Sequence, residues 1–235
     1  MLKRLLFLLV LFQLTSCAEL QQAAGTLLNE ATLTNAEVGN GLKEALEIGI
    51  SKGSEKLSLK DGYFKSAYKI LLPEEVQKVT NTLQRIPGFS EVENEMLRLL
   101  NRAAEDAAKE AKPIFVNAIK QMTFEDAMGI LMGDKDAATQ YLVNTTRQSL
   151  YDAFMPKIKT SLDRVNATEY WNQAITTYNK IPLIDKVNPE LDDYVTDKAL
   201  DGLFAMVEKE ELNIRNNVSA RTSDLLKKVF AKQDN

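Results

Sequence analysis

The chain has 235 residues, of which 45% are hydrophobic and 26% charged, and its formal net charge is −4. This composition is typical of a globular protein, and the mild negative charge gives no electrostatic reason to bind nucleic acid. Histidine is absent and there is one cysteine. These two facts exclude a Ser-His-Asp triad, a Cys-His dyad, a histidine-ligated zinc site and an internal disulfide. We expect no metal and no cofactor.

The first sixteen residues have the pattern of a secretory signal peptide. Lys3 and Arg4 are followed by an unbroken apolar run, Leu5 to Phe12, which is too short to span a membrane. The run leads to Leu14-Thr15-Ser16-Cys17, which resembles the lipobox of bacterial lipoproteins, where signal peptidase II cleaves before a cysteine that becomes lipidated. We predict a cleaved signal peptide over 1–16, lipidation of Cys17, and a tether over 17–35.

The lipobox also predicts a location. Each buried CH₂ of an acyl chain contributes about 0.8 kcal/mol, so more than one chain on Cys17 gives stable membrane attachment. Ala18 follows the cysteine, and by analogy with lipoprotein sorting the absence of Asp there favours the outer membrane. The residues after Cys17 contain no acidic run of the kind that would indicate export to the cell surface. We expect a lipid-anchored protein of the bacterial envelope that faces the periplasm, with the membrane and an envelope protein as its partners.

Helical patterns fill the rest of the chain, and we predict one all-α domain, a compact multi-helix bundle, over 36–232. Thr34 and Glu37 form a capping box before the first helix. Glycines within that helix indicate close packing against a neighbour, at positions 39, 41, 49 and 53. The segment Tyr63 to Leu72 fits either an extended arm or a turn of helix. No useful length of period-2 alternation predicts a strand.

The stretch from Ser90 to Val143 predicts four helical pieces. Alanines give the first piece a shallow face that a neighbouring helix can approach closely, at positions 103, 104, 107, 108 and 111. Pro113 is expected to end this piece, because proline lacks a backbone donor and restricts the residue before it. Thr123 and Asp126 are expected to cap a short helix, and Asp134 the next one.

Later boundaries are predicted from proline and capping residues. The long helix after Asp134 is expected to stop at Pro156. Asn188 and Pro189 have the pattern of a helix start, and Ser219 or Thr222 is expected to cap the last helix.

Four segments carry a resemblance to a known family. The chain is similar to the bacterial lipoproteins catalogued as domain-of-unknown-function family 4197, over roughly Gly41 to Phe230. The resemblance implies a single helical domain behind a lipobox and implies no activity. Its segments are NRAAEDAAKEAKPIFVNAIKQMT (101–123), DAMGILMGDKDAATQYL (126–142), YVTDKALDGLFAMVEKEELNIRNN (194–217) and LLKKVF (225–230).

Two groups of charged residues could carry chemistry. One surrounds the i,i+4 pair of Glu211 and Arg215, and the other surrounds Glu105 on the alanine-faced helix. Our favoured interpretation is a structural ion network, made of Arg102, Glu105, Asp201, Glu210, Glu211, Arg215 and Arg221. The other interpretation is a carboxyl group with a raised pKa that acts as general acid on a glycosidic bond, for which the candidates are Glu105, Glu210 and Glu211.

Three functions therefore stay open. The leading hypothesis is an envelope lipoprotein with a non-enzymatic binding or structural role, because no catalytic set is assembled in the sequence. A second is a binder of a hydrophobic small ligand or lipid, with Tyr170, Trp171, Phe204 and Met206 lining a cavity. The third is a glutamate-dependent cell-wall enzyme of the glycosidase type.

Overall fold

The computed structural model describes residues 34–74, 77, 89–164, 167–180, 182–183, 186 and 190–231. Their regular secondary structure is helical, with no strand among them, so the predicted all-α class is confirmed. None of the helices in these ranges has the length and hydropathy needed to cross a bilayer. The predicted signal peptide and almost all of the tether lie outside the described residues.

The first described helix, α3 (Asn35–Ser58), begins at the predicted capping box. The backbone N–H of Glu37 donates to the Thr34 hydroxyl at 3.2 Å, and the Thr34 N–H donates to the Glu37 carboxylate at 2.8 Å. Two orphan donors at the helix start are thereby satisfied. A Cβ on Gly41 would lie 2.6 Å from Val229, so the absence of a side chain there allows the close approach of the last helix.

The central stretch forms the predicted series of helices. These are α5 (Phe89–Ala107), a 3₁₀ turn (Ala108–Glu110), α6 (Ala111–Gln121), α7 (Phe124–Met132) and α8 (Ala137–Asp163). The alanines at 103, 104, 107, 108 and 111 are all buried, at most 1% exposed. The break precedes Pro113, which lies in the first turn of α6, where a missing N–H costs no hydrogen bond. Thr123 and Asp126 form a second capping box, at the start of α7.

The expected stop at Pro156 is wrong, because α8 continues through it to Asp163. Phe154, Ile158 and Leu162 are fully buried on either side of the proline and hold both halves of the helix against one core. Pro156 and Asp152 lie on the exposed face, so the carbonyl that loses its intrahelical partner faces water.

The remaining helices are α9 (Ala167–Tyr178), α10 (Leu191–Asn216), a 3₁₀ turn (Val218–Ala220) and α11 (Asp224–Phe230). The last helix is capped by neither Ser219 nor Thr222. Ser223 occupies the N-cap position, and its hydroxyl accepts the N–H of Leu226 at 3.2 Å. The predicted start at Asn188 and Pro189 lies outside the described residues, and α10 begins at Leu191.

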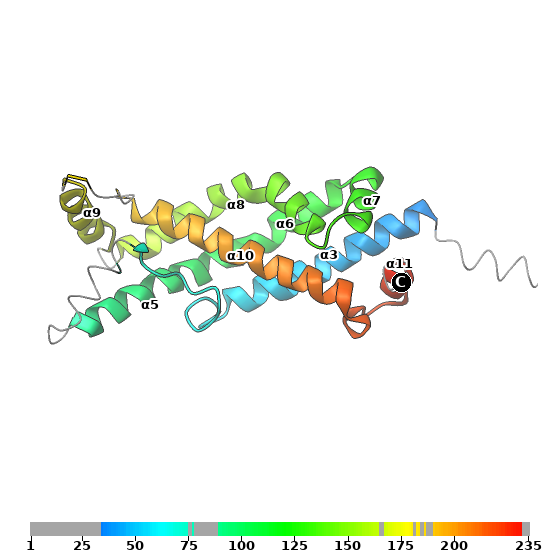
Figure 1. The fold of residues 1–235 in the computed structure, drawn as a ribbon, viewed down its shortest axis with the longest axis horizontal. Coiled ribbons are helices and arrows are strands. Elements are labelled where there is room, and N and C mark those ends of the chain that lie inside the picture. The colour runs from blue at the N-terminus through cyan, green and yellow to red at the C-terminus, as the bar shows by residue number, and fades with distance from the viewer. Residues whose placement is uncertain are drawn as a thin grey trace, which may run out of the picture.

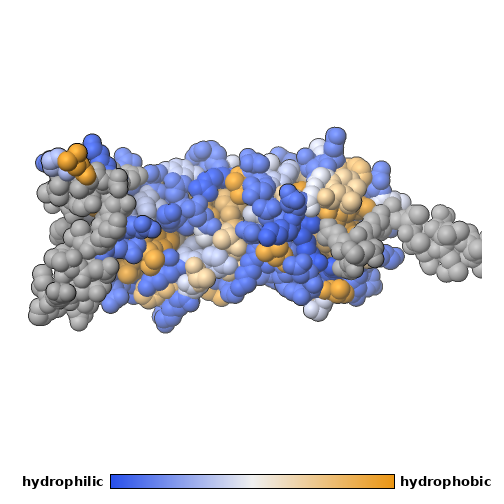
Figure 2. All heavy atoms as spheres, in the orientation of Figure 1, coloured by the Kyte–Doolittle hydropathy of each residue, from blue (hydrophilic) through white to orange (hydrophobic). Residues whose placement is uncertain are grey.

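The helices build an elongated bundle (Figure 1). α8 and α10 pack side by side, α5 packs on α8, and α3 packs on α10, α6, α7 and α11. The first half of α3, α7, the end of α10 and α11 gather at one end of the bundle, opposite α9 (Figure 1). One cluster of buried side chains from these helices forms the core. The face in Figure 2 is mainly hydrophilic, with separate hydrophobic areas.

Candidate functional site

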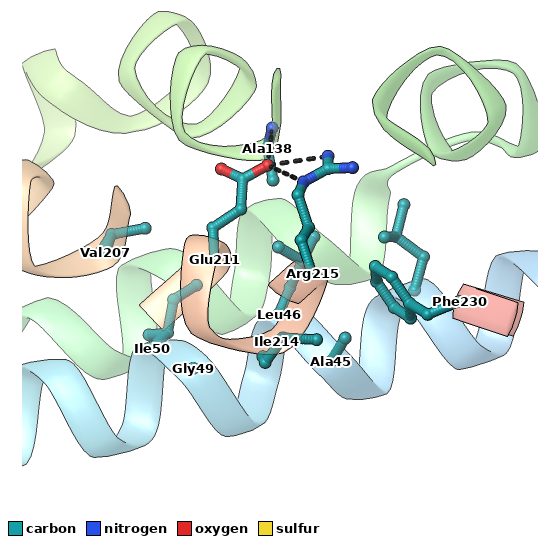
Figure 3. Close-up of a pocket in the computed structure, with 11 residues that line it drawn as sticks. Ala45, Leu46, Gly49, Ile50, Ala138, Val207, Glu211, Ile214, Arg215 and Phe230 are labelled. Atoms are coloured by element: carbon teal, nitrogen blue, oxygen red, sulfur yellow. Dashed lines mark hydrogen bonds and ion pairs between the residues drawn. The ribbon is translucent and has the colours of Figure 1, made fainter. Parts of the chain in front are cut away.

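The most densely bonded carboxylate among the described residues belongs to Glu211, which lies on the buried face of α10. Its side chain points at the first turn of α8 (Figure 3). One oxygen accepts the N–H of Ala138 at 3.0 Å, and the other accepts the N–H and hydroxyl of Thr139, both at 2.8 Å. Glu211 therefore acts as the N-cap of a helix that is remote in sequence, and its negative charge lies at the positive end of the α8 dipole.

Arg215 completes this arrangement from the next turn of α10. Its Nε donates to the Glu211 carboxylate at 2.9 Å, and its Nη2 donates to the carbonyl of Ile130 at 2.8 Å. Ile130 lies in the last turn of α7, so the guanidinium is placed at the negative end of that helix dipole. The ion pair on α10 thus provides hydrogen-bond partners for backbone groups at the end of α7 and at the beginning of α8.

The expected cap at Asp134 is wrong. The residue before α8 is Asp136, whose side chain makes no capping bond to the helix. It instead accepts from the Gln140 side chain at 3.2 Å. The carboxylate of Glu211 occupies the place that a local cap would fill.

A small cavity lies under the Glu211–Arg215 pair, between α3 and α10 (Figure 3). Its volume is about 20 Å³, and apart from the ion pair its lining is apolar. A space of this size holds about one water molecule, whereas ligand pockets are on the order of hundreds of Å³. The lining residues are Leu42, Ala45, Leu46, Gly49, Ile50, Ala138, Val207, Glu211, Ile214, Arg215 and Phe230.

Glu105 on α5 holds a different element, the arm of residues 59–73 that follows α3. One carboxylate oxygen accepts the backbone N–H groups of Tyr63 and Phe64, at 3.1 and 3.2 Å. The other oxygen is paired with Arg102, which also binds Asp61. Asp61 has a positive φ of 72° in the turn that opens the arm, and its hydrogen bonds to Arg102 and then to Lys65 lower its pKa.

Asn101, one turn before Glu105, holds the far end of the arm. Its side-chain oxygen accepts the N–H of Ile70 at 2.8 Å, and its side-chain nitrogen donates to the Ile70 carbonyl at 2.9 Å. The same nitrogen donates to the Leu97 carbonyl at 2.7 Å. The fully buried amide therefore bonds to Ile70 as a neighbouring strand would. Of the two forms left open for Tyr63 to Leu72, its last part is an extended arm, preceded by turns.

Tyr63 fastens the same arm to α10. Its hydroxyl donates to the carbonyl of Ala199 at 2.7 Å, and the ring is fully buried. Burial raises the pKa of the Tyr63 phenol well above its usual range, and the nearby charge of Glu105 adds to this effect. The phenol is therefore a neutral structural donor at any physiological pH.

The seven charged residues do not form one network in the part of the chain that the structure describes. Arg102 pairs with Glu105, and Glu211 pairs with Arg215. Asp201 lies in a separate exposed group, 3.2 Å from Arg147 and 3.5 Å from Lys198.

The two other residues of the predicted network have different roles. The buried guanidinium of Arg221 donates to the carbonyls of Ile214 and Arg215, at the end of α10, and lies over the ring of Phe230. Glu210 is half-buried beside Glu211, and no described residue forms a hydrogen bond or ion pair with its carboxylate.

Trp171, Phe204 and Met206, three of the four residues named for a ligand cavity, are part of the packed interior. Phe204 makes an edge-to-face contact with Phe115 at 5.8 Å, and Trp171 stacks on Tyr194 at 6.5 Å. Met206 is 1% exposed and packs against Gly53 of α3. The side chain of Tyr170 lies outside the described part of the chain.

This geometry suits the positioning of helices better than acid–base chemistry. Glu211 is 8% exposed and receives five donor atoms, and Glu105 is 4% exposed and receives two amides and a guanidinium. A general acid must reach a substrate atom within hydrogen-bond distance, and neither carboxylate has an open approach. The described residues also contain no cluster of three or more acidic, histidine or cysteine side chains able to hold a metal ion.

The sequence did not predict that Asn101 anchors the arm or that Glu211 caps α8. The signal was present in the helical period. Leu97, Asn101 and Glu105 lie on one stripe of α5, and Val207, Glu211 and Ile214 on one stripe of α10. A polar residue on a buried stripe needs a partner, and here the partner is the backbone of another element.

Comparison with known proteins gives one match. A family model described as "Protein of unknown function (DUF4197)" matches residues 32–231. Comparisons with curated proteins and with solved structures give no match. The matched range contains all of the described helices and both buried carboxylate sites. The chain belongs to the DUF4197 family.

Proposed function

We propose that this protein is a lipid-anchored component of the bacterial envelope, whose helical body has a binding or structural role. The anchor is Cys17, at the end of an apolar leader. The observation that carries the non-enzymatic part is the occupation of Glu105 and Glu211 by backbone amides and arginines. Glu105 and Glu211 are two of the three candidate general acids, and their bonds hold helix ends and the arm.

An open groove between α6 and α8 supports a binding role. Its volume is about 490 Å³. None of its lining residues is charged, although 26% of the chain is. Amide and hydroxyl side chains beside apolar ones suit a neutral protein segment with exposed backbone groups. The lining residues are Pro113, Ile114, Asn117, Ala118, Gln121, Tyr141, Thr145, Thr146 and Ser149.

The experiment is crosslinking in intact cells followed by purification of the tagged, anchored protein. We expect one envelope protein to be enriched with the wild type and lost with Asn117→Arg, which puts a charge into the groove from an exposed position. Gln140→Arg, on an exposed part of α8 outside the groove, is the matched control and should retain the partner. Capture that is the same for both variants and the wild type would contradict this groove as the binding surface.

The enzymatic alternative is tested with the purified protein and its carboxylate variants. Glu210→Gln removes the one candidate carboxylate without a described partner, and its half-buried position makes the change mild for the fold. We expect release of cell-wall fragments by the purified protein to be indistinguishable from a no-protein blank for the wild type and the variant. The opposite result would be release of cell-wall fragments by the wild type and none by a folded Glu210→Gln or Glu105→Gln variant. That result would show that the protein is an enzyme.

A further inference from the structure

One exposed flank of α7 is apolar. The inner side packs on the core through Ala127, Ile130 and Leu131. Next to this face, Phe124 is 42% exposed and Met132 is 70% exposed, with Met128 half-buried between them. At about 100° per residue these three side chains fall within an arc of about 80° on the helix. The apolar surface of α7 therefore continues well beyond the face that the bundle covers, and Figure 2 shows hydrophobic side chains gathered over this helix.

This face lies where the chain enters the bundle. Phe124 is 3.9 Å from the position of a Cβ on Gly39 in α3. Together they border an open groove of about 220 Å³, which is also lined by Asn35 and Ala36 at the very start of α3. Val218, 55% exposed, follows the end of α10 at the same end of the molecule (Figure 1).

The length of the preceding chain limits how far this end can be from the anchor. Thr34, the N-cap of α3, follows Cys17 by 17 residues. This length spans at most about 58 Å when fully extended and about 26 Å as a helix. A lipid on Cys17 thus keeps the start of α3 within about 58 Å of the bilayer, and this start lies at the α7 end of the bundle, opposite α9 (Figure 1).

We propose that the face of α7 formed by Phe124, Met128 and Met132 rests on the surface of the lipid bilayer that holds the Cys17 anchor. This inference depends on the proposed lipid anchor. The tether supplies most of the affinity, and the three side chains add a contact that orients the bundle end-on, since a tethered contact works at high effective concentration.

A bilayer fits this face better than a folded partner. Three side chains on a nine-residue helix offer far less than the roughly 800 Å² per partner that a stable protein interface buries. Charges around the face have both signs, with Lys120 and Lys135 beside Glu125 and Asp134, all exposed. The contact therefore relies on apolar insertion rather than on attraction to anionic headgroups, and salt should not weaken it.

The test uses the lipidated full chain in vesicles of phosphatidylethanolamine and phosphatidylglycerol. The chain's single cysteine is the one that carries the lipid, so Phe124→Cys or Met132→Cys gives one thiol for an environment-sensitive dye. Leu59→Cys, 64% exposed just beyond the far end of α3, is the matched control. With nitroxide-labelled lipids, we expect the dye at positions 124 and 132 to be quenched at least about twofold and the dye at 59 to be unaffected.

Each other result contradicts the proposal in its own way. Equal quenching at all three positions would mean that the bundle lies flat on the membrane, and no quenching at 124 and 132 would mean that α7 does not touch it. A third result is a dye whose emission is blue-shifted but not quenched by the labelled lipids. If deletion of residues 18–31 then exposes this dye to water, the tether covers the face. Vesicle flotation tests the lipid anchor separately from the α7 contact. The Cys17→Ser variant is the control that should not float. If the wild type also fails to float, the anchor itself is absent.

Discussion

The carboxylate of Glu211 on α10 accepts the backbone N–H of Ala138 at 3.0 Å, across a separation of 73 residues. The start of the longest described helix is thus completed by a side chain from its neighbour in the bundle. Through Arg215 the same pair also binds the end of α7. The α7–α8 turn and α10 can therefore form their final structure only together.

Replacing Glu211 with Gln should destabilise the protein by about 3 kcal/mol, because it leaves the guanidinium of Arg215 buried without its counter-charge. The Arg215 side chain is 8% exposed. The free energy of unfolding in urea measures the loss. Glu210→Gln is the control, since the adjacent half-buried carboxylate has no described partner, and it should change stability by less than about 0.5 kcal/mol. Equal losses in the two variants would contradict the capping role.

Alanine substitutions at two nearby glycines of α3 should have opposite effects on stability, because only Gly41 lies at the contact with α11. A Cβ on Gly41 would lie 2.6 Å from Val229 and 3.2 Å from Leu225, and the overpacking should outweigh the helix propensity gained, with a net loss of about 1 kcal/mol. A Cβ on Gly39 meets nothing closer than Phe124 at 3.9 Å, so Gly39→Ala should stabilise by about 0.5 kcal/mol. Thermal unfolding of the two variants compares them directly, and the same sign for both would refute this packing.

Replacing Asn101 with Ala should release the arm of residues 59–73. The change leaves the buried N–H and carbonyl of Ile70 without their partner, at a cost of about 3 kcal/mol. We expect the Ile70 amide to exchange with solvent much faster than in the wild type, and trypsin to cut at Lys69. Asn117→Ala, at an exposed position of α6, is the control, since among the described residues its side chain bonds Gln121 alone, at 3.4 Å. An unchanged exchange rate at Ile70 would show that the arm is held by other contacts.

The two capping boxes predict a loss of stability in acid. Backbone and hydroxyl hydrogen bonds from Thr34 lower the pKa of Glu37, and those from Thr123 lower the pKa of Asp126. A carboxylate whose pKa is lower in the folded than in the unfolded protein stabilises the fold. This stabilisation is fully present above the unfolded pKa, 4.5 for Glu37 and 3.8 for Asp126, and is lost as the pH falls through the folded pKa.

The double variant Glu37→Gln, Asp126→Asn should therefore be less stable than the wild type at neutral pH and differ less from it in acid. Urea midpoints measured from about pH 6 down to about pH 3 follow this convergence. A gap between the two proteins that stays constant over this range would show that the carboxylates contribute no pH-dependent stability.

The parts of the fold that were predictable are those fixed by neighbours in sequence. Thr34 and Glu37, like Thr123 and Asp126, are three residues apart, so their capping boxes are visible as short motifs. The alanine face of α5 follows from the helical period. Both features depend on local geometry, which the sequence carries directly.

The parts that were not predictable depend on distant contacts. Pro156 is a helix breaker by local rules, yet the buried side chains around it keep α8 continuous. Asp134 has the local pattern of a cap, but the carboxylate that caps α8 comes from Glu211. The charged residues were grouped by their spacing along the chain, whereas in the bundle Asp201 pairs with Arg147 of α8.

The proposed lipid anchor is tested by the intact mass of the protein taken from bacterial membranes. We expect a chain that starts at Cys17, lacks the first sixteen residues, and carries the added mass of its lipid on that residue. Cys17→Ser should appear in the soluble fraction without this mass. A wild-type protein cut elsewhere, with Cys17 as an unmodified thiol, would rule out the anchor.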